Sequence, residues 1–567
     1  MFWHMSDDLK NDLNVPGTKV IIDDTTSATG SDNFKLTPVP SSDPNDPLNW
    51  TLRRKWLYVI CMVMWVMASC AGMGSLYPIY DALSEETGLT LDQINTGAGY
   101  LYFFQQVWSL FSQPLAVTIG TRPIFIVTCA GLCIFPFCLS LVSTNSQWVG
   151  LIIVNSIFTS PVYVLPELAL SDIFFYHERS FPFGVYISAI WGCAFVVPIY
   201  SGFLYTRFGL NGPTYFAGGC CAFAAVFLFL FLEETNFERK VPEHGNKVEA
   251  ETIDKTTVES RYDLEKMTAT TTDIVAVDGE DSTSSSPSSG YEASPHMYNH
   301  KTTPWPGPRP FQKSPVSPHW WGILWRTWFQ NFAFYRLPIL LWCSVIMAYT
   351  QIYSNITSAL SSGILGDEPY NMSPNMVGLT FVSPLLANIP GALAAGWITD
   401  WWTIRKARQN GGVSEPEDKL SLSIIPTILS PIGCLMMGLG PYYGAHWIVF
   451  VLGEFVITIA GPLANLIAIN YAFDAYHGIQ PKDQSGPRFE VQKGAPYILS
   501  PTLLAMGISF GFSYAITPWA FDAGFKIWAI TAAIVSICMT GSGLLMMIWG
   551  KRLRKSGAGF YEKIINI

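Results

Sequence analysis

Charged residues are scarce in this 567-residue sequence. Asp, Glu, Lys and Arg together supply 13% of it, whereas soluble globular chains carry about 25%. This shortage excludes an ordinary soluble protein of several domains. The basic residues also form no stripe, so we expect no nucleic-acid partner. The formal net charge of −9 says little on this point, because the acidic residues crowd into the termini and one central segment.

Several catalytic and cross-linking patterns are missing as well. The 11 cysteines fall mostly in apolar runs, where cysteine behaves as a small hydrophobe, so no disulfide framework is expected. Membrane oxygenases need clustered histidines, and only His296 and His300 come close to such a cluster. No Gly-x-x-x-x-Gly-Lys-Ser/Thr phosphate loop occurs, which argues against ATP-driven pumping. We therefore expect no enzyme, no cofactor and no metal.

Long apolar runs are what the sequence has in abundance. Hydrophobic residues make up 50% of the chain, and its mean hydropathy is +0.28. A bilayer core is about 30 Å thick, and a helix crosses it with roughly 20 apolar residues. Twelve such runs lie at 57–80, 94–116, 124–142, 147–172, 183–205, 213–232, 337–360, 374–399, 421–440, 447–470, 497–519 and 526–550. They predict an all-α membrane protein with twelve transmembrane helices in two six-helix bundles.

A long hydrophilic gap divides the runs into six and six. The predicted parts are a cytoplasmic N-terminal tail (1–56), an N-terminal six-helix bundle (57–232), a cytoplasmic linker (233–336), a C-terminal six-helix bundle (337–550) and a cytoplasmic C-terminal tail (551–567). The linker is rich in Ser, Thr and Glu and cannot bury enough apolar area to fold, so we expect most of it to be disordered. Its end, HWWGILWRTWF at 319–329, predicts an interfacial helix.

The distribution of Lys and Arg predicts which side each loop faces. Arg53, Arg54 and Lys55 precede the first apolar run, and cations flank the cytoplasmic ends of spanning helices. The segments then predicted outside are about 81–93, 143–146, 206–212, 361–373, 441–446 and 520–525. Of the 33 Lys and Arg residues, these segments contain only Arg207, with Lys526 at a border. Residues 1–50 contain no signal-peptide core, and we expect both termini to be cytoplasmic.

Several motifs accompany this layout. They are DPNDPLNW (43–50), LPELALSDIFFYHERS (165–180), FLEETNFER (231–239), ANLIAINYAFDAY (464–476) and SYAITPW (513–519). In this combination the chain resembles a fungal branch of the major facilitator superfamily, which includes proton-coupled exporters of drugs and metabolites and permeases for cations and polyamines. We expect a monomer in the plasma membrane, or alternatively in the vacuolar or another internal membrane.

The resemblance also implies gating residues at the loops between helices. Those carried over are Gly120, Arg122, Gly396, Asp400 and Arg405. Val117 and Thr118 stand where the superfamily usually has Asp-Arg, so the first of these loops departs from the pattern. At the inner end of the fourth helix, Asp172, Glu178 and Arg179 are expected to form a gate or a loop ion pair.

Two carboxylates fall deep inside predicted spans. Glu167 lies two-thirds along the fourth helix and Glu454 one-third along the tenth, and these two helices occupy comparable places in the two repeats. A carboxylate near mid-bilayer costs about 2.5–3.5 kcal/mol, so a cavity or a partner must compensate. Burial favours the neutral acid, and a group that gains and loses a proton is what a proton carrier needs. We predict that both bind protons or substrate; alternatively, Glu167 caps a Pro-broken helix and Glu454 lies near an interface.

Polar and aromatic side chains within the spans are candidates for lining a central cavity. They are Gln105, Gln106, Trp191, Gln351, Tyr353, Asn355, Asn465 and Asn470. Asn355 follows Gln351 by four residues, so both face one way on a helix. Packing is the alternative role for each candidate. Asn371-Met372-Ser373 is a glycosylation sequon in a segment predicted outside.

These features predict a secondary active transporter that moves a small organic molecule by alternating access. The favoured function is proton-coupled efflux of a secondary metabolite or xenobiotic. Proton-coupled uptake of a cation or polyamine is the main alternative, because two acids without a compensating base suit a cationic cargo. A sensor on a transporter fold, which binds without turnover, is the alternative from another class.

Overall fold

The computed structural model describes most of the apolar part of the chain. The described residues are 15–20, 41, 43, 45–76, 79–139, 141–175, 178–237, 304–307, 320–366, 370–410, 413–476 and 496–566. The predicted disordered linker lies mostly outside them, as does the segment 477–495.

The first half of the chain forms six long helical segments. They are α2 (Leu52–Gly74), α4 (Leu91–Ile119), α5 with α6 (Thr121–Leu132, Ile134–Leu139), α7 with η4 and α8 (Asn145–Thr159, Ser160–Tyr163, Leu165–Ile173), α9 (Ser180–Phe208) and α10 (Asn211–Phe231). The fourth segment changes to a 3-10 turn at Pro161, because proline cannot donate the helical hydrogen bond. Two further short elements are η2 (Pro47–Asn49) before α2 and α3 (Tyr80–Thr87) after it.

The second half repeats the pattern. Its segments are α13 (Pro338–Gly366), α14 with α15 (Pro374–Thr380, Val382–Gln409), η6 with α16 (Pro416–Ser423, Ile424–Tyr442), α17 (Ile448–Ala475), α19 with η7 (Pro496–Thr517, Pro518–Asp522) and α20 (Phe525–Asn566). The helix predicted at 319–329 is present as α12 (Trp320–Ala333), followed by η5 (Phe334–Arg336). A two-stranded antiparallel sheet pairs β1 (Lys19–Val20) with β2 (Val413–Ser414).

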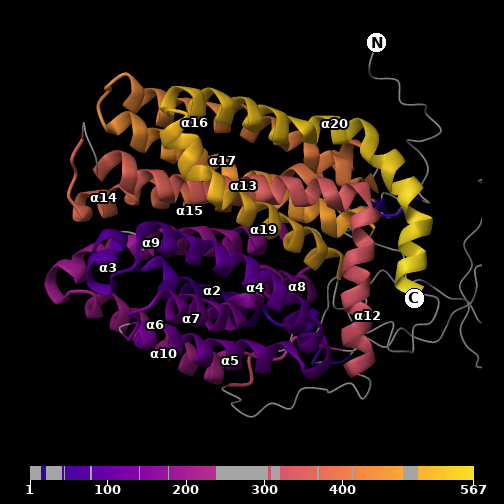
Figure 1. Cartoon of the computed structure of the whole chain (residues 1–567). Helices are drawn as coiled ribbons and strands as arrows, with labels where there is room; N and C mark the ends of the chain where they lie inside the picture. The colour runs from indigo at the N-terminus through magenta and orange to yellow at the C-terminus, as the bar shows by residue number, and fades with distance from the viewer. Residues whose placement is uncertain are drawn as a thin grey trace, which may run out of the picture. The chain divides into compact units, whose positions relative to one another are not determined.

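Ten of the twelve segments are long and apolar enough to cross a membrane, judged by length and composition over the described residues. The second and eleventh segments, α4 and α19, complete the set, and α19 contains the shorter apolar stretch Ser500–Phe512. Figure 1 shows the helices of the first half, indigo to magenta, and those of the second half, red to yellow, as two neighbouring groups. The predicted all-α fold with twelve membrane helices in two bundles is confirmed.

Glycines bring the two halves into close contact along α9 and α15. A Cβ on Gly184 would lie 2.7 Å from the carbonyl oxygen of Ala392, and one on Gly396 would lie 2.8 Å from that of Ser180. A larger residue at either position would therefore push the helices apart, since small residues permit close helix packing in membranes. Elsewhere α4 packs against α19, where the rings of Phe103 and Phe510 have centroids 5.1 Å apart.

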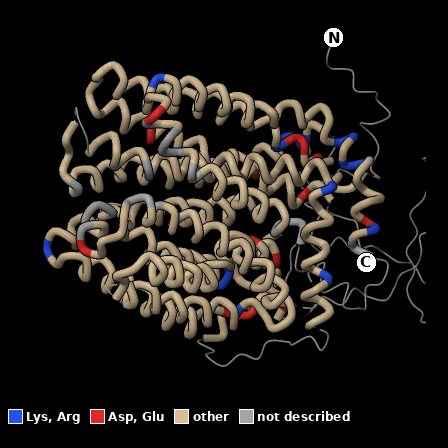
Figure 2. Tube along the Cα trace, in the orientation of Figure 1, with Lys and Arg blue, Asp and Glu red and all other residues tan. Residues whose placement is uncertain are grey.

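Ionisable residues gather at one end of the helices, as Figure 2 shows. We call this the charged end. The helices α2, α9 and η6 begin there, and α15 and α17 end there. The last helix, α20, continues past the predicted span through residues 551–566. Its extension is packed rather than free, since Tyr561 is buried and stacks on Tyr476 with a centroid separation of 4.8 Å.

Candidate functional site: a cavity between the two halves

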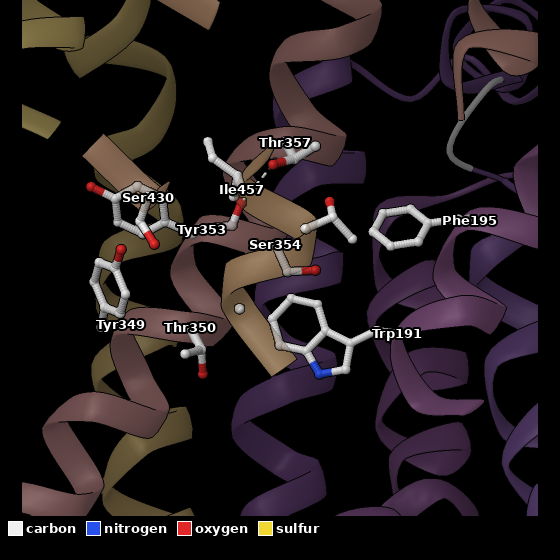
Figure 3. Close-up of a pocket in the computed structure, with 11 residues that line it drawn as sticks. Trp191, Phe195, Tyr349, Thr350, Tyr353, Ser354, Thr357, Ser430 and Ile457 are labelled. Carbon is white, nitrogen blue, oxygen red and sulfur yellow. Dashed lines mark hydrogen bonds between the residues drawn. The ribbon is translucent and has the colours of Figure 1, made fainter. Parts of the chain in front are cut away.

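A small cavity lies between α9 of the first half and three helices of the second, α13, α16 and α17. Its volume is about 10 Å³, close to the least that one water molecule needs. The lining residues are Trp191, Phe195, Tyr349, Thr350, Tyr353, Ser354, Thr357, Ser430, Ile457, Thr458 and Gly461. Figure 3 shows the rings of Trp191 and Phe195 on one side and the α13 residues facing them. The structure is thus closed around this site.

Aromatic rings and hydroxyl groups make up most of the cavity wall. The Tyr353 hydroxyl donates a 2.6 Å hydrogen bond to the carbonyl oxygen of Ala532, and the Tyr349 hydroxyl lies 2.7 Å from Ser536 Oγ. Both bonds run to α20, so they fix the two rings in place. The lining contains no Lys and no Arg. Such a wall suits an apolar or cationic group, because aromatic faces attract cations.

Glu454 lies one helical turn from this wall. Its side chain is fully buried on α17, four residues before Thr458. Ser361 of α13 donates a hydrogen bond to its Oε1, and Oε2 has no hydrogen-bond partner among the described residues. Ser361 in turn follows Thr357 by four residues, so both groups continue the surface that lines the cavity. A buried carboxylate with a single hydroxyl donor is well placed to hold a proton.

Glu167 occupies a different place. It is buried in the first turn of α8, and its Oε2 also has no hydrogen-bond partner among the described residues. It does not line the cavity. An ionised acid in the first turn stabilises a helix through its dipole, so the predicted capping role and the predicted proton role both fit this position.

Two of the predicted lining residues, Trp191 and Tyr353, line the cavity, and the other six do not. Gln105 Nε2 donates a 2.9 Å hydrogen bond to the carbonyl oxygen of Thr159, linking α4 to the end of α7. Gln351 Nε2 donates to Asn355 Oδ1 at 3.3 Å. The remaining candidates are Gln106, which is buried, Asn465, which is half-buried, and Asn470, which is fully buried at the charged end.

An ion pair joins the two halves at the charged end. Arg179 precedes α9, and its Nη2 lies 2.5 Å from Oδ1 of Asp474 near the end of α17. The second oxygen of Asp474 accepts a 2.9 Å hydrogen bond from Lys419 Nζ. All three side chains are buried. The predicted gating role of Arg179 therefore has a geometric basis, with partners in the second half.

Asp400 makes a second link between the halves. Its Oδ2 accepts the backbone N–H of Phe181 at 3.0 Å, which is one of the unpaired donors at the start of α9. Gly396 lies one turn earlier on α15 and touches Ser180. A carboxylate at a helix N-terminus is favourable because of the helix dipole, so Asp400 holds α9 against α15.

The loop between α4 and α5 is closed by an acid from another part of the chain. Gly120 has φ +111°, a conformation that favours glycine. Oε1 of Glu234 accepts the backbone N–H of Thr121 at 3.0 Å, and Oε2 accepts that of Arg122 at 3.3 Å. Arg122 Nη2 donates to the carbonyl oxygen of Phe229 at 3.0 Å. Glu234 thus caps α5 beside the loop that lacks the usual Asp-Arg pair.

The other predicted residues lie apart from the cavity. Arg405 is exposed, with its guanidinium 5.1 Å from the centroid of the Trp401 ring. Glu178 is exposed and Asp172 half-buried. Asn371, the predicted glycosylation site, is exposed between α13 and α14 with φ +45°.

Sequence reasoning missed three ionisable residues that take part in these contacts: Asp474, Lys419 and Glu234. Asp474 and Glu234 both belong to motifs quoted above, so an acid at the end of an apolar run was a usable signal. Their partners lie too far away in sequence to be paired with them from composition or spacing.

The chain matches the model of the Major Facilitator Superfamily over residues 62–486. It belongs to this family. With two bundles enclosing a cavity and relatives named as transporters, it is a multi-pass membrane transporter of a small substrate.

Two fungal relatives match nearly the whole chain. An uncharacterized MFS-type transporter of Schizosaccharomyces pombe is 25% identical over 94% of this chain and 90% of its own length. Protein HOL1 of Saccharomyces cerevisiae is 24% identical over 95% of this chain and 93% of its own. Among solved structures, the proton:xylose symporter XylE has a TM-score of 0.54 and 11% identity, covering 87% of this chain and 95% of that one. That likeness shows the fold alone.

Proposed function

We propose that this chain is a proton-coupled secondary transporter that exports a small organic molecule, with cationic cargo favoured. The observation that carries the proposal is the cavity between the halves. Its wall consists largely of aromatic rings and hydroxyls, it contains no Lys or Arg, and Glu454 lies one turn away. A cation entering such a site gains from the ring faces and from an acid that can ionise beside it.

Proton exchange follows from the surroundings of Glu454. Burying an ionised carboxylate without a neighbouring cation costs several kcal/mol. In the closed site without cargo, Glu454 therefore holds a proton. A cationic cargo stabilises the ionised form and releases that proton. Cargo and proton then compete for the Glu454 carboxylate, so one leaves when the other binds, which is antiport. When the outside is more acidic, protons enter and the cargo is exported.

The test is flux in vesicles that contain the purified protein, under an imposed pH gradient. Tetraphenylphosphonium and spermidine serve as probes, and a pH-sensitive dye reports protons. We expect Glu454→Gln to lower proton-linked flux at least tenfold. The matched control is Glu86→Gln, at an exposed position on α3. Unchanged pH dependence in Glu454→Gln would refute the assigned role, and binding of both probes without flux would favour a sensor.

Uptake of a cation or polyamine is the second candidate. The observation that favours it is Glu167, a second buried acid away from the cavity. With two acids, one holds the proton while the other contacts the cation, and both cross together. The direction of proton movement separates the candidates: cargo and protons move in opposite directions in exchange and in the same direction in symport.

The proposal includes a monomer in the plasma membrane with both termini cytoplasmic. The Lys and Arg distribution supports this orientation. Tags on either end should be inaccessible from the medium in unbroken cells, and a tag that antibodies reach from outside would contradict it. A fluorescent tag at the C-terminus separates the plasma membrane from the vacuolar membrane.

A further inference from the structure

A short segment of the N-terminal tail is docked on the second half of the protein. Lys19 of β1 pairs with Ser414 of β2, and Val15 is buried with 3% of its surface exposed. The N–H of Thr18 donates to the carbonyl oxygen of Val15 at 3.2 Å and closes a turn between them. We call residues 15–20 the strap.

The strap touches the helix end that carries the cross-half ion pair. Gly17 has φ +87°, and a Cβ there would overlap the carbonyl oxygen of Asp474 and lie 3.0 Å from that of Ala475. Both features require glycine. The strap therefore packs directly on the backbone of Asp474, whose side chain reaches Arg179 of the first half.

A buried arginine also holds the strap, next to the same carbonyl oxygens of α17. Arg554 of α20 donates through Nε and Nη2 to Glu417, at 2.8 Å and 2.5 Å, and through Nη1 to the carbonyl oxygen of Pro16. Arg554 is fully buried. Tyr471, one turn before the end of α17, donates to the same Glu417 carboxylate at 3.1 Å. Strap, α17 and α20 thus share one hydrogen-bonded network.

The next described part of the tail is held on the first half. Asn49 Nδ2 donates to the carbonyl oxygens of Ser41 and Asp43 at 2.8 Å and closes this part of the tail. The Arg54 guanidinium of α2 lies 4.3 Å from the centroid of the Trp50 ring and bonds to Glu233 at 2.6 Å. The tail therefore contacts both halves of the transporter, at residues 15–20 and at 41–50.

We propose that the strap is a conformational device that stabilises the closed charged end. Docking on Asp474 and Ala475 fixes the end of α17 in the position from which Asp474 reaches Arg179. That ion pair exists only while the charged end is closed, so the strap and the closed state stabilise each other. Such a coupling is reciprocal: closing the charged end strengthens docking of the strap as much as docking favours closing. The strap shifts the equilibrium between the open and closed states only as far as it binds the closed state more tightly than the open one.

The test uses the full-length purified protein with Ser180→Cys as a reporter. Ser180 is fully buried between the halves at the charged end, so a maleimide labels the introduced thiol only when that end opens. We expect Gly17→Ala to raise the labelling rate at least fivefold. The matched control is Gly88→Ala, since Gly88 has φ +72° but open space around its Cβ position. The protein with native Ser180 gives the background from the native cysteines.

Two further measurements decide the mechanism. In an Arg179→Gln background, Gly17→Ala should raise the labelling of the reporter thiol no further, because the ion pair through which the strap acts is gone. A peptide with the sequence of residues 12–23, added to the Gly17→Ala protein, should slow labelling, and the same peptide carrying the Gly17→Ala change should not. Equal labelling in Gly17→Ala and Gly88→Ala would overturn the proposal, as would a full effect of Gly17→Ala without Arg179. Labelling requires no transport, so a failure here leaves the proposed cargo and proton coupling untouched.

Discussion

Three buried acidic residues differ in role because their side chains contact different groups. Glu454 faces one hydroxyl and no described cation, and for this reason we propose it as the proton-binding group. Asp474 faces Arg179 and Lys419 and joins the two halves through an ion pair. Glu234 faces backbone N–H groups at the start of α5 and acts as a cap. The residue type is nearly the same in all three, and the surroundings differ.

Removing the cap on α5 should weaken the first half. Glu234→Ala leaves the N–H groups of Thr121 and Arg122 without their acceptor, at a cost of about 1–3 kcal/mol. We expect a lower midpoint of thermal unfolding in detergent. Glu86→Ala, at an exposed position on α3, is the control, and equal midpoints for the two variants would show that the cap contributes nothing.

In the cavity wall, removing an aromatic ring should lower cargo affinity more than removing a single hydroxyl group. Trp191→Ala deletes a ring face, and a cation–π contact worth about 1–2 kcal/mol corresponds to a roughly tenfold rise in KM. Tyr353→Phe keeps the ring and loses only the hydrogen bond to Ala532, so its KM should change severalfold less. Concentration dependence of flux in vesicles measures both, and a larger effect for Tyr353→Phe would contradict the assignment.

At the level of secondary-structure elements, α9 and α15 form a close contact between the two halves. Their approach depends on glycine at Gly184 and Gly396, and on Asp400 holding the start of α9. The long α20 packs within the second half. Its Ala532 carbonyl oxygen accepts the hydrogen bond from Tyr353 near the cavity, and its Arg554 bonds to Glu417 at the charged end.

Inserting side-chain volume between these helices should block turnover. Gly396→Val places methyl groups against Ser180 and Phe181 and separates α9 from α15. We expect at least a tenfold fall in flux at an unchanged amount of folded protein, measured in vesicles after size-exclusion chromatography. Gly507→Val is the matched control, because nothing lies within 4 Å of the Cβ position at that glycine of α19.

For the whole molecule, a buried ion pair between Arg179 and Asp474 joins the two halves at the charged end. Removing one partner of such a pair costs about 3–5 kcal/mol, because the other charge remains buried. Arg179→Gln and Asp474→Asn should each destabilise the protein. The double variant should lose less than the two single losses combined, by more than about 1 kcal/mol. Thermal unfolding of the four proteins of this cycle measures the coupling, and strict additivity would contradict a direct pair.

The amino-acid sequence alone predicts the number, approximate place and helical nature of the spans. Crossing a bilayer depends on local apolar length, and a break such as that at Pro161 follows from the chemistry of one residue. It also identified Glu167 and Glu454 as buried acids, because a charge within an apolar run is visible locally. The bounds were less accurate, since α20 continues to Asn566 through packing that no hydropathy window detects.

Contacts between groups that are distant in the sequence became visible only in the folded chain. Arg179 pairs with Asp474, Arg554 reaches Pro16, and Glu454 accepts from Ser361. Each pair joins different segments of the fold, so each depends on how whole helices pack and not on any local pattern. For the same reason Trp191 and Tyr353 line the cavity while other polar residues of similar appearance do not: what a side chain faces is set by the neighbouring helix.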